Sequence, residues 1–166
     1  MRRMMLGHRV GDDVAEHVQA THQYAEYDHV LRGFEMSSAL IAPNPHPAPE
    51  LEDPVRDFRP LVRSGWRAPH VWVDAAETES VLDWFGSSYV LVLGPDCDLQ
   101  QWEAAVAQAE SVVPIKVRQL PTALPVAPYE SDAIVLVRPD GIIAQRVRQA
   151  GATSIADFQP YLPATG

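Results

Sequence analysis

Hydrophobic and polar positions alternate in recognisable patterns through the second half of the chain. Ser88–Leu93 is a near-continuous apolar run, which is typical of a strand buried on both faces. Leu99–Ala109 has apolar residues at helical spacing, and Asp98 is well placed to cap a helix there. Ile115–Leu120 alternates as a strand does, and Ala133–Val137 predicts a further strand.

Shorter elements flank these segments. Val71–Val73 predicts a first strand, and Thr78–Trp84 predicts a short turn of helix or a loop. Pro139-Asp140-Gly141 is typical of a hairpin turn, after which Ile142–Ala144 can pair back. Ser154–Leu162 predicts a last short helix. The order strand, helix, strand, hairpin and helix predicts one small α/β domain.

The N-terminal part has a different character. Residues 12–32 have apolar positions at broadly helical spacing and predict a helix that stops at Gly33. Phe34–Ile41 predicts a short strand. Residues 43–60 hold six prolines, which cannot form a hydrogen-bonded ladder and therefore predict an extended connector. We expect residues 1–60 to form this extension and residues 61–166 to form the α/β domain.

Composition and charge exclude several classes of function. A formal net charge of -9 and a pI near 5.0 argue against nucleic-acid binding, which needs a basic face. The sequence has no run of 18 apolar residues and no signal peptide at its start, so we expect no membrane association. A single cysteine excludes an internal disulfide and favours the reducing cytoplasm.

Three motifs resemble a known family. They are S-G-W-R-A-P-H-V-W-V-D at Ser64–Asp74, L-D-W-F-G at Leu82–Gly86 and V-R-P-D-G-I-I-A-Q-R at Val137–Arg146. Their order and spacing are similar to those at the C-terminus of flavin-dependent aromatic hydroxylases. The resemblance implies a thioredoxin-like α/β sandwich. One departure is Gln145, where the family usually has tryptophan.

The flavin-binding body of such hydroxylases is missing from the sequence. A flavin or nicotinamide fold needs a glycine-rich turn that lets the backbone approach a pyrophosphate, and the sequence has no G-x-G-x-x-G. We therefore expect the chain to bind no flavin and to need no cofactor.

Candidate catalytic groups are few. Cys97 precedes the predicted helix, where thioredoxins keep a reactive thiol, but it has no second cysteine nearby, and Asp96 and Asp98 disfavour a thiolate. His17, His22 and His29 are not spaced to share a helix face as metal ligands. The nucleophile motif G-x-S-x-G is absent. We assign no catalytic, cofactor-binding or metal-binding residue.

Aromatic residues near the junction are the remaining candidates. Trp66 beside Arg67 looks hard to bury within the small domain, and large aromatics with arginine are enriched at interfaces. We expect His70 to fix the connector through a hydrogen bond. The interface candidates are Trp66, Arg67, His70 and Trp72 at the junction, and Tyr24, Tyr27 and Phe34 in the extension.

These observations leave three hypotheses open. The first is a stand-alone, non-catalytic domain that forms a homodimer or binds a separate flavin-dependent hydroxylase. The second is a small cofactor-free tailoring enzyme of aromatic polyketide or phenolic metabolism, with a pocket between the extension and the sandwich. The third is a fragment of a complete hydroxylase, although Met1 and the extension favour an independent chain.

Overall fold

The computed structural model describes residues 35–50, 59–109, 113–151 and 154–163. The chain divides into two compact units, and the description below concerns the unit formed by Phe34–Ala48 and Pro60–Gly166. The helix predicted over residues 12–32 lies outside the described residues, as do the interface candidates Tyr24, Tyr27 and Phe34.

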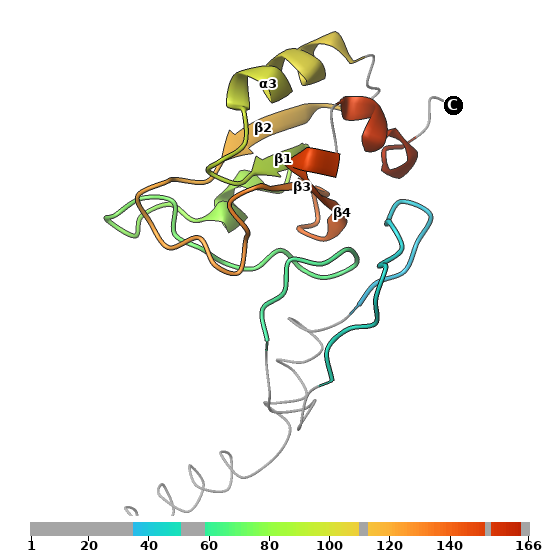
Figure 1. Cartoon of the computed structure of the whole chain (residues 1–166), viewed down its shortest axis with the longest axis horizontal. Coiled ribbons are helices and arrows are strands. Elements are labelled where there is room, and N and C mark those ends of the chain that lie inside the picture. Colours follow the sequence, from blue (N-terminus) through green and yellow to red (C-terminus); the bar gives the residue numbers. More distant parts are fainter. Residues whose placement is uncertain (1–34, 51–58, 110–112, 152–153, 164–166) are drawn as a thin grey trace, which may run out of the picture. The chain divides into compact units, whose positions relative to one another are not determined.

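A mixed four-stranded sheet forms the centre of this unit (Figure 1). The strands are β1 (Tyr89–Leu93), β2 (Ile115–Gln119), β3 (Ala133–Val137) and β4 (Ile143–Arg148), and their order across the sheet is β2-β1-β3-β4. β1 runs parallel to β2 and antiparallel to β3, and β3 and β4 form an antiparallel hairpin. With the helix between β1 and β2, this is the predicted thioredoxin-like α/β fold.

The helix α3 (Leu99–Gln108) covers one face of the sheet. It begins where the sequence predicts, because the Asp98 carboxylate accepts a hydrogen bond from the Gln101 N–H at 3.0 Å. Trp102 on its inner side is fully buried and meets the ring of Phe158 edge to face, with ring centroids 5.8 Å apart. Leu91 and Leu136 of the central strands complete this half of the core.

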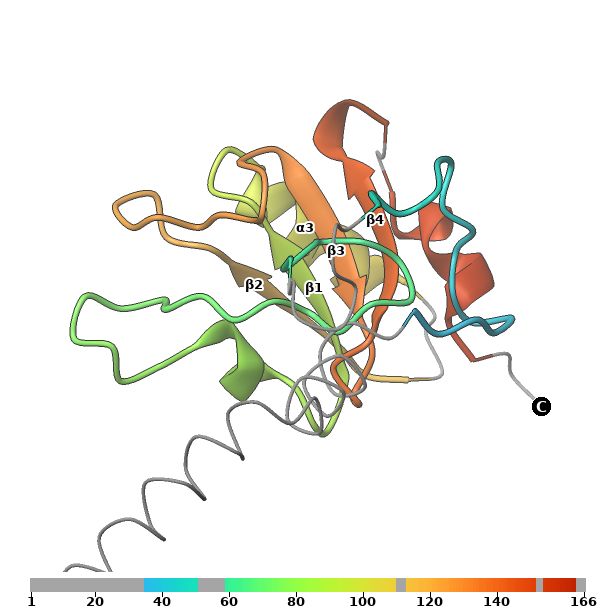
Figure 2. The same ribbon diagram turned by 90° about the horizontal axis from the view of Figure 1, so that it is seen from below.

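Loops rather than helices cover the opposite face. Figure 2 views the sheet from below, with these loops in front of it and α3 behind. Val71 turns inward from the loop that precedes β1, and Val81 does so from the short 3-10 turn within that stretch. Leu120 and Tyr129 turn inward from the loop after β2. They bury the side of β1 and β3 that α3 leaves open, including Val90, Val92, Val135 and Val137.

The predicted strand at Val71–Val73 is wrong. The segment forms a single bridge, between Trp72 and Ser80, and joins no strand of the sheet. The chain turns back at once around the side chain of Asp74, which accepts hydrogen bonds from the backbone N–H groups of Thr78 and Glu79. The predicted short turn of helix is present as the 3-10 turn η1 (Val81–Trp84).

The predicted last helix is also different from expectation. The chain forms two 3-10 turns, η3 (Ile155–Asp157) and η4 (Gln159–Tyr161), after an earlier turn η2 (Gln149–Gly151). Phe158 lies between η3 and η4 and is fully buried. A continuous helix is interrupted here because Pro160 has no backbone N–H to donate.

Residues 35–48 form an irregular segment along β4, so the strand predicted at Phe34–Ile41 is wrong over its described part. Ser38 starts a turn instead, accepting a hydrogen bond from the Ile41 N–H at 3.1 Å through its carbonyl. Beyond the turn, the Ala42 N–H donates to the Ala144 carbonyl at 2.7 Å. Ala144 is the extra residue at a bulge in the β3–β4 pairing, which frees its carbonyl for this contact.

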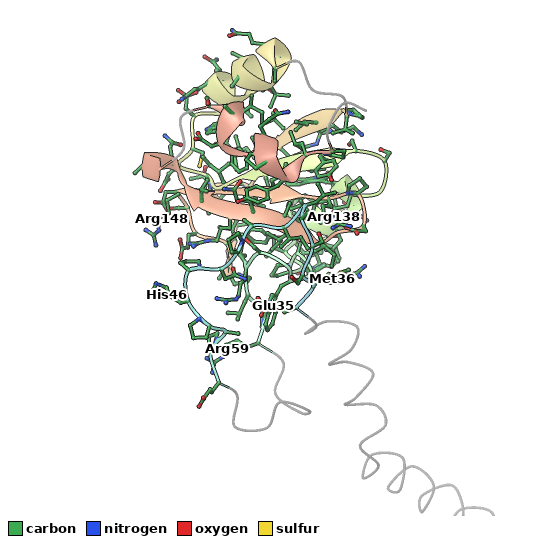
Figure 3. The ribbon with its side chains drawn as sticks, turned by 90° about the vertical axis from the view of Figure 1, so that its right-hand side faces the viewer. Glu35, Met36, His46, Arg59, Arg138 and Arg148 are labelled. Carbon is green, nitrogen blue, oxygen red and sulfur yellow. The ribbon has the colours of Figure 1, made fainter. Side chains whose placement is uncertain are left out.

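The same segment is tied to residues 63–65. Asn44 donates through its side-chain amide to Glu35 Oε1 and to the Ser64 carbonyl, both at 2.9 Å, and the Arg63 guanidinium donates to the His46 carbonyl. Figure 3 shows Glu35 and His46 on the opposite side of the sheet from α3. The predicted boundary at residue 60 therefore divides a region whose earlier part, Phe34–Ala48, belongs to the same compact unit as the sheet.

Gly65 allows this close approach, and replacing it should destabilise the fold. Its φ is +83°, and a Cβ atom there would lie 2.4 Å from the Met36 carbonyl oxygen. We expect Gly65→Ala to lower the free energy of unfolding by about 1–3 kcal/mol in urea titrations. Gly151→Ala is the control, because a Cβ at Gly151 would meet no atom of the described residues beyond its chain neighbours within 4 Å. Equal stability of the two variants would contradict this account.

Candidate interaction site at the domain junction

Residues 63–68, named here the junction segment, are fixed to the outer edge of β4. Gly65 N–H donates to the Ile143 carbonyl at 2.8 Å, Ile143 N–H donates to the Trp66 carbonyl at 2.9 Å, and Ala68 N–H donates to the Gly141 carbonyl at 2.9 Å. This pairing covers an edge that would otherwise expose unpaired backbone groups. It also decides which side chains of the segment point inward.

The structure corrects the expectation for Trp66. Its side chain is 9% exposed, so the small domain does bury it. The pairing with β4 places Trp66 and Ala68 against the unit while Arg67 between them stays exposed. The Trp66 indole N–H has no hydrogen-bond partner among the described residues. Trp66 is therefore a core residue, and Arg67 remains available at the surface.

The expected role of His70 is also wrong, because His70 makes no hydrogen bond with any described residue. The group that fixes this part of the connector is Tyr129, whose hydroxyl donates to the Pro69 carbonyl at 3.0 Å. Tyr129 is 4% exposed, and burial raises the pKa of its phenol. No motif in the sequence distinguishes Tyr129, because it follows a proline-rich loop and meets Pro69 only in the folded chain.

His70 and Trp72 form a pair on the outer surface. Their rings meet edge to face with centroids 4.5 Å apart and an interplanar angle of 88°. They face outward because Val71 between them is buried in the core. Trp72 is 37% exposed and Leu82 is 38% exposed, two of the three exposed large hydrophobic side chains in the described part of the chain. Exposed aromatic surface of this kind is typical of binding sites.

A pocket of about 400 Å³ lies beside this pair. It is formed between residues 69–80, named here the junction loop, and the proline-rich loop after β2. These two loops are far apart in the sequence. Its lining residues are His70, Val71, Trp72, Asp74, Ala75, Glu77, Leu124, Pro125 and Ala127. Sequence reasoning identified His70 and Trp72 but not the pocket, since no local pattern brings the two loops together.

The two carboxylates of the pocket have different surroundings. Asp74 accepts hydrogen bonds from the Thr78 hydroxyl, the Thr78 N–H at 2.9 Å and the Glu79 N–H at 3.2 Å. These bonds, the Thr78 hydroxyl foremost, lower the pKa of Asp74. Glu77 is exposed and has a φ of +55°, a left-handed conformation that is uncommon for residues other than glycine.

Cys97 is not part of this site. Its side chain is 5% exposed, and its Sγ lies 3.4 Å from the Ala133 carbonyl oxygen as a hydrogen-bond donor. Burial raises the pKa of the thiol, and the charges of Asp132 and Asp96 add to this effect. The position therefore favours a neutral and unreactive thiol.

Other kinds of site receive no support within the described residues. These residues contain no group of three His, Cys, Asp or Glu side chains placed to hold a metal ion. His17, His22 and His29 lie outside them. Among the helices the structure describes, none is long and apolar enough to cross a membrane.

Comparison with known proteins decides the family. Residues 62–160 match the family model of the aromatic-ring hydroxylase C-terminal domain. The chain belongs to this family. The resemblance seen in the three motifs is thereby confirmed.

Several relatives are hydroxylases or monooxygenases that are longer than this chain. Aklavinone 12-hydroxylase RdmE of Streptomyces purpurascens is 33% identical over 151 residues, which cover 82% of this chain and 26% of RdmE. A 4-methyl-5-nitrocatechol 5-monooxygenase of a Burkholderia species is 37% identical over 99 residues, which cover 53% of this chain and 18% of that enzyme. The chain thus spans about a quarter or less of the length of these relatives.

Solved structures of larger hydroxylases superpose on most of this chain through a similar share of their own length. The flavin-dependent monooxygenase PieE, in complex with FAD and substrate, superposes with a TM-score of 0.68 at 26% identity, covering 89% of this chain and 28% of PieE. An aklavinone-11 hydroxylase with FAD and aklavinone superposes with a TM-score of 0.59 at 27% identity, covering 81% and 26%. The fold of this chain corresponds to one part of these larger hydroxylases.

Tyr129→Phe tests the anchor of the junction loop. The change removes the hydrogen bond to Pro69 and leaves a buried carbonyl unpaired, so we expect the free energy of unfolding to fall by about 1–2 kcal/mol. Tyr161→Phe is the matched control, because the Tyr161 hydroxyl makes no hydrogen bond with a described residue. The measurement is urea unfolding followed by fluorescence. Equal losses in the two variants would contradict the anchoring role.

The Cys97 thiol should be protected in the folded chain. We expect iodoacetamide to alkylate it at least roughly tenfold more slowly in the native protein than in denaturant, because burial disfavours the reactive thiolate. Stability should also fall as the pH rises above the unfolded thiol pKa of about 8.5, since only the unfolded chain then ionises. Cys97→Ser should lose this part of the pH dependence. Fast alkylation of the native thiol would contradict the account.

Proposed function

We propose that this chain acts as a non-catalytic binding domain that packs on the flavin-binding body of an aromatic hydroxylase. The observation that carries the proposal is the exposed His70–Trp72 pair, which lies within the family match and directly after the junction segment. The ring of Trp72 is a large apolar surface that a partner can cover. The buried thiol of Cys97, whose pKa is raised, fits a role in binding rather than thiol chemistry.

The relatives supply the class of partner. RdmE is an aklavinone hydroxylase, and PieE is a flavin-dependent monooxygenase solved with FAD and substrate. By similarity, the body that this domain supports would bind FAD and hydroxylate an aromatic or polyketide-derived ring. The domain would stabilise that body through the surface formed by Arg67, His70, Trp72 and Leu82, named here the junction face. We place the complex in the cytoplasm, and self-association through the same face is the competing arrangement.

A chimera of this chain with RdmE tests this proposal. Residues 34–166 of this chain replace the matching C-terminal region of RdmE, so that the covalent link compensates for a weak interface. We expect the chimera to hydroxylate aklavinone and to unfold in one calorimetric transition. Its domain should unfold at a higher temperature than the isolated chain does.

Two variants of the chimera assign the effect to the junction face. Trp72→Ala should weaken the coupling between the two parts by about 1–2 kcal/mol, the usual size for a buried interface aromatic. Gln108→Ala is the control, because Gln108 is exposed on α3, on the opposite side of the sheet from the junction face (Figure 2). A chimera that behaves like the RdmE body without any C-terminal domain would overturn the proposal. The proposal would also be overturned if this chain formed a homodimer that Trp72→Ala dissociates, while the chain had no effect on the RdmE body.

A further inference from the structure

Carboxylates lie on one side of the pocket. Asp74 and Glu77 line the pocket beside His70, and no Lys or Arg is among the lining residues. The proline-rich loop on the other side, residues 121–128, is uncharged. The potential in the pocket therefore favours a cation.

Glu77 is the carboxylate that is free to receive that cation. Asp74 already accepts three hydrogen bonds from Thr78 and Glu79. The Glu77 carboxylate makes no hydrogen bond or ion pair with any described residue, and its left-handed backbone places it at the turn beside Asp74. An exposed carboxylate without a partner among the described residues can bind a ligand that brings positive charge and hydrogen-bond donors.

The rest of the pocket suits a flat cation with an apolar stem. Trp72 offers part of its ring surface, and indole is the strongest aromatic partner for a cation. Leu124 and Pro125 on the facing loop supply an apolar wall. A guanidinium group can stack on an aromatic ring and bind a carboxylate at the same time, while its aliphatic stem covers the wall.

We infer that the pocket receives an arginine side chain from the protein partner that covers the junction face. This inference rests on the proposed function, because His70 and Trp72 belong to both the junction face and the pocket. The arginine stacks on Trp72, pairs with Glu77 and passes its stem along Leu124 and Pro125. Arginine residues are enriched among the side chains that dominate protein interfaces.

A titration with a minimal probe tests the pocket separately from the partner. N-acetyl-arginine amide is added to the full-length, 15N-labelled chain, and N-acetyl-citrulline amide serves as its neutral isostere. We expect the arginine probe, and not the citrulline probe, to shift the Trp72 indole N–H signal and the backbone signals of Thr78 and Glu79. The shifts should decrease with added salt, since the site is open to solvent.

One pair of variants assigns the charge effect. Glu77→Gln should weaken binding of the arginine probe about threefold, which is the size of one exposed ion pair. Glu103→Gln is the control, because Glu103 is an exposed acid on α3, outside the pocket. Equal shifts with the arginine and citrulline probes would overturn the inference, and so would equal effects of the two variants.

The outcomes distinguish this inference from the proposed function. If the chimera couples through Trp72 but the arginine probe does not bind, the arginine pocket is wrong and the binding function stands. If the probe binds through Glu77 while the chimera shows no coupling, the pocket accepts guanidinium but the hydroxylase partner is wrong. Tight binding of a neutral anthraquinone in place of arginine would make the pocket a small-molecule site and overturn the inference.

Discussion

β1 and β3 bury every one of their side chains, because both faces of the sheet are covered. Each apolar side chain removed from water in this way contributes about 1.5–3 kcal/mol, so neither face can be left open. α3 covers one face in the regular manner of an α/β domain. The other face depends on loops, and their positions depend on a few specific contacts: the approach of residue 36 to Gly65, the Tyr129 hydroxyl on Pro69 and the pairing of residues 65–68 with β4. The junction loop is therefore part of the core as well as part of the surface.

This double role explains the candidate site. Val71 and Val81 must point inward to cover the sheet, so their neighbours Trp72 and Leu82 must point outward. The same constraint brings the proline-rich loop beside the junction loop, because Leu120 and Tyr129 at its two ends are also buried. A pocket with an aromatic side and two carboxylates results from that arrangement. The surface chemistry of the domain thus follows from how its second face is closed.

The sequence was sufficient where local pattern determines structure. β1, β2, β3, α3 and its Asp98 cap could be predicted, since apolar runs, helical spacing and a capping side chain act within a few residues. The β3–β4 hairpin followed from Pro139-Asp140-Gly141 in the same way. Predictions failed for two reasons. Trp66 is buried by its pairing with β4, a distant segment that no local pattern reveals. The other two failures have local causes, since the 71–73 segment turns around Asp74 before it can join a sheet and Pro160 divides the last helix. The pocket was beyond prediction for the first reason, because the two loops that form it are distant in the sequence.

Membership of the aromatic-ring hydroxylase C-terminal family gives these features a common interpretation. Its described residues form a buried core, hold a buried thiol and expose the His70–Trp72 pair, and these features support the proposed binding role. The pocket beside that pair supports the further proposal that a partner is chosen by charge.

Hydrogen–deuterium exchange of the full-length chain, with and without the separately purified part of PieE that lies outside the matched region, tests the central claim most directly. The account expects slower exchange in residues 70–82 and 121–128 when that part of PieE is present, and unchanged exchange in α3 on the opposite side of the sheet. Protection confined to α3, or no protection at any described residue, would contradict the claim that this domain binds a hydroxylase body through its junction face.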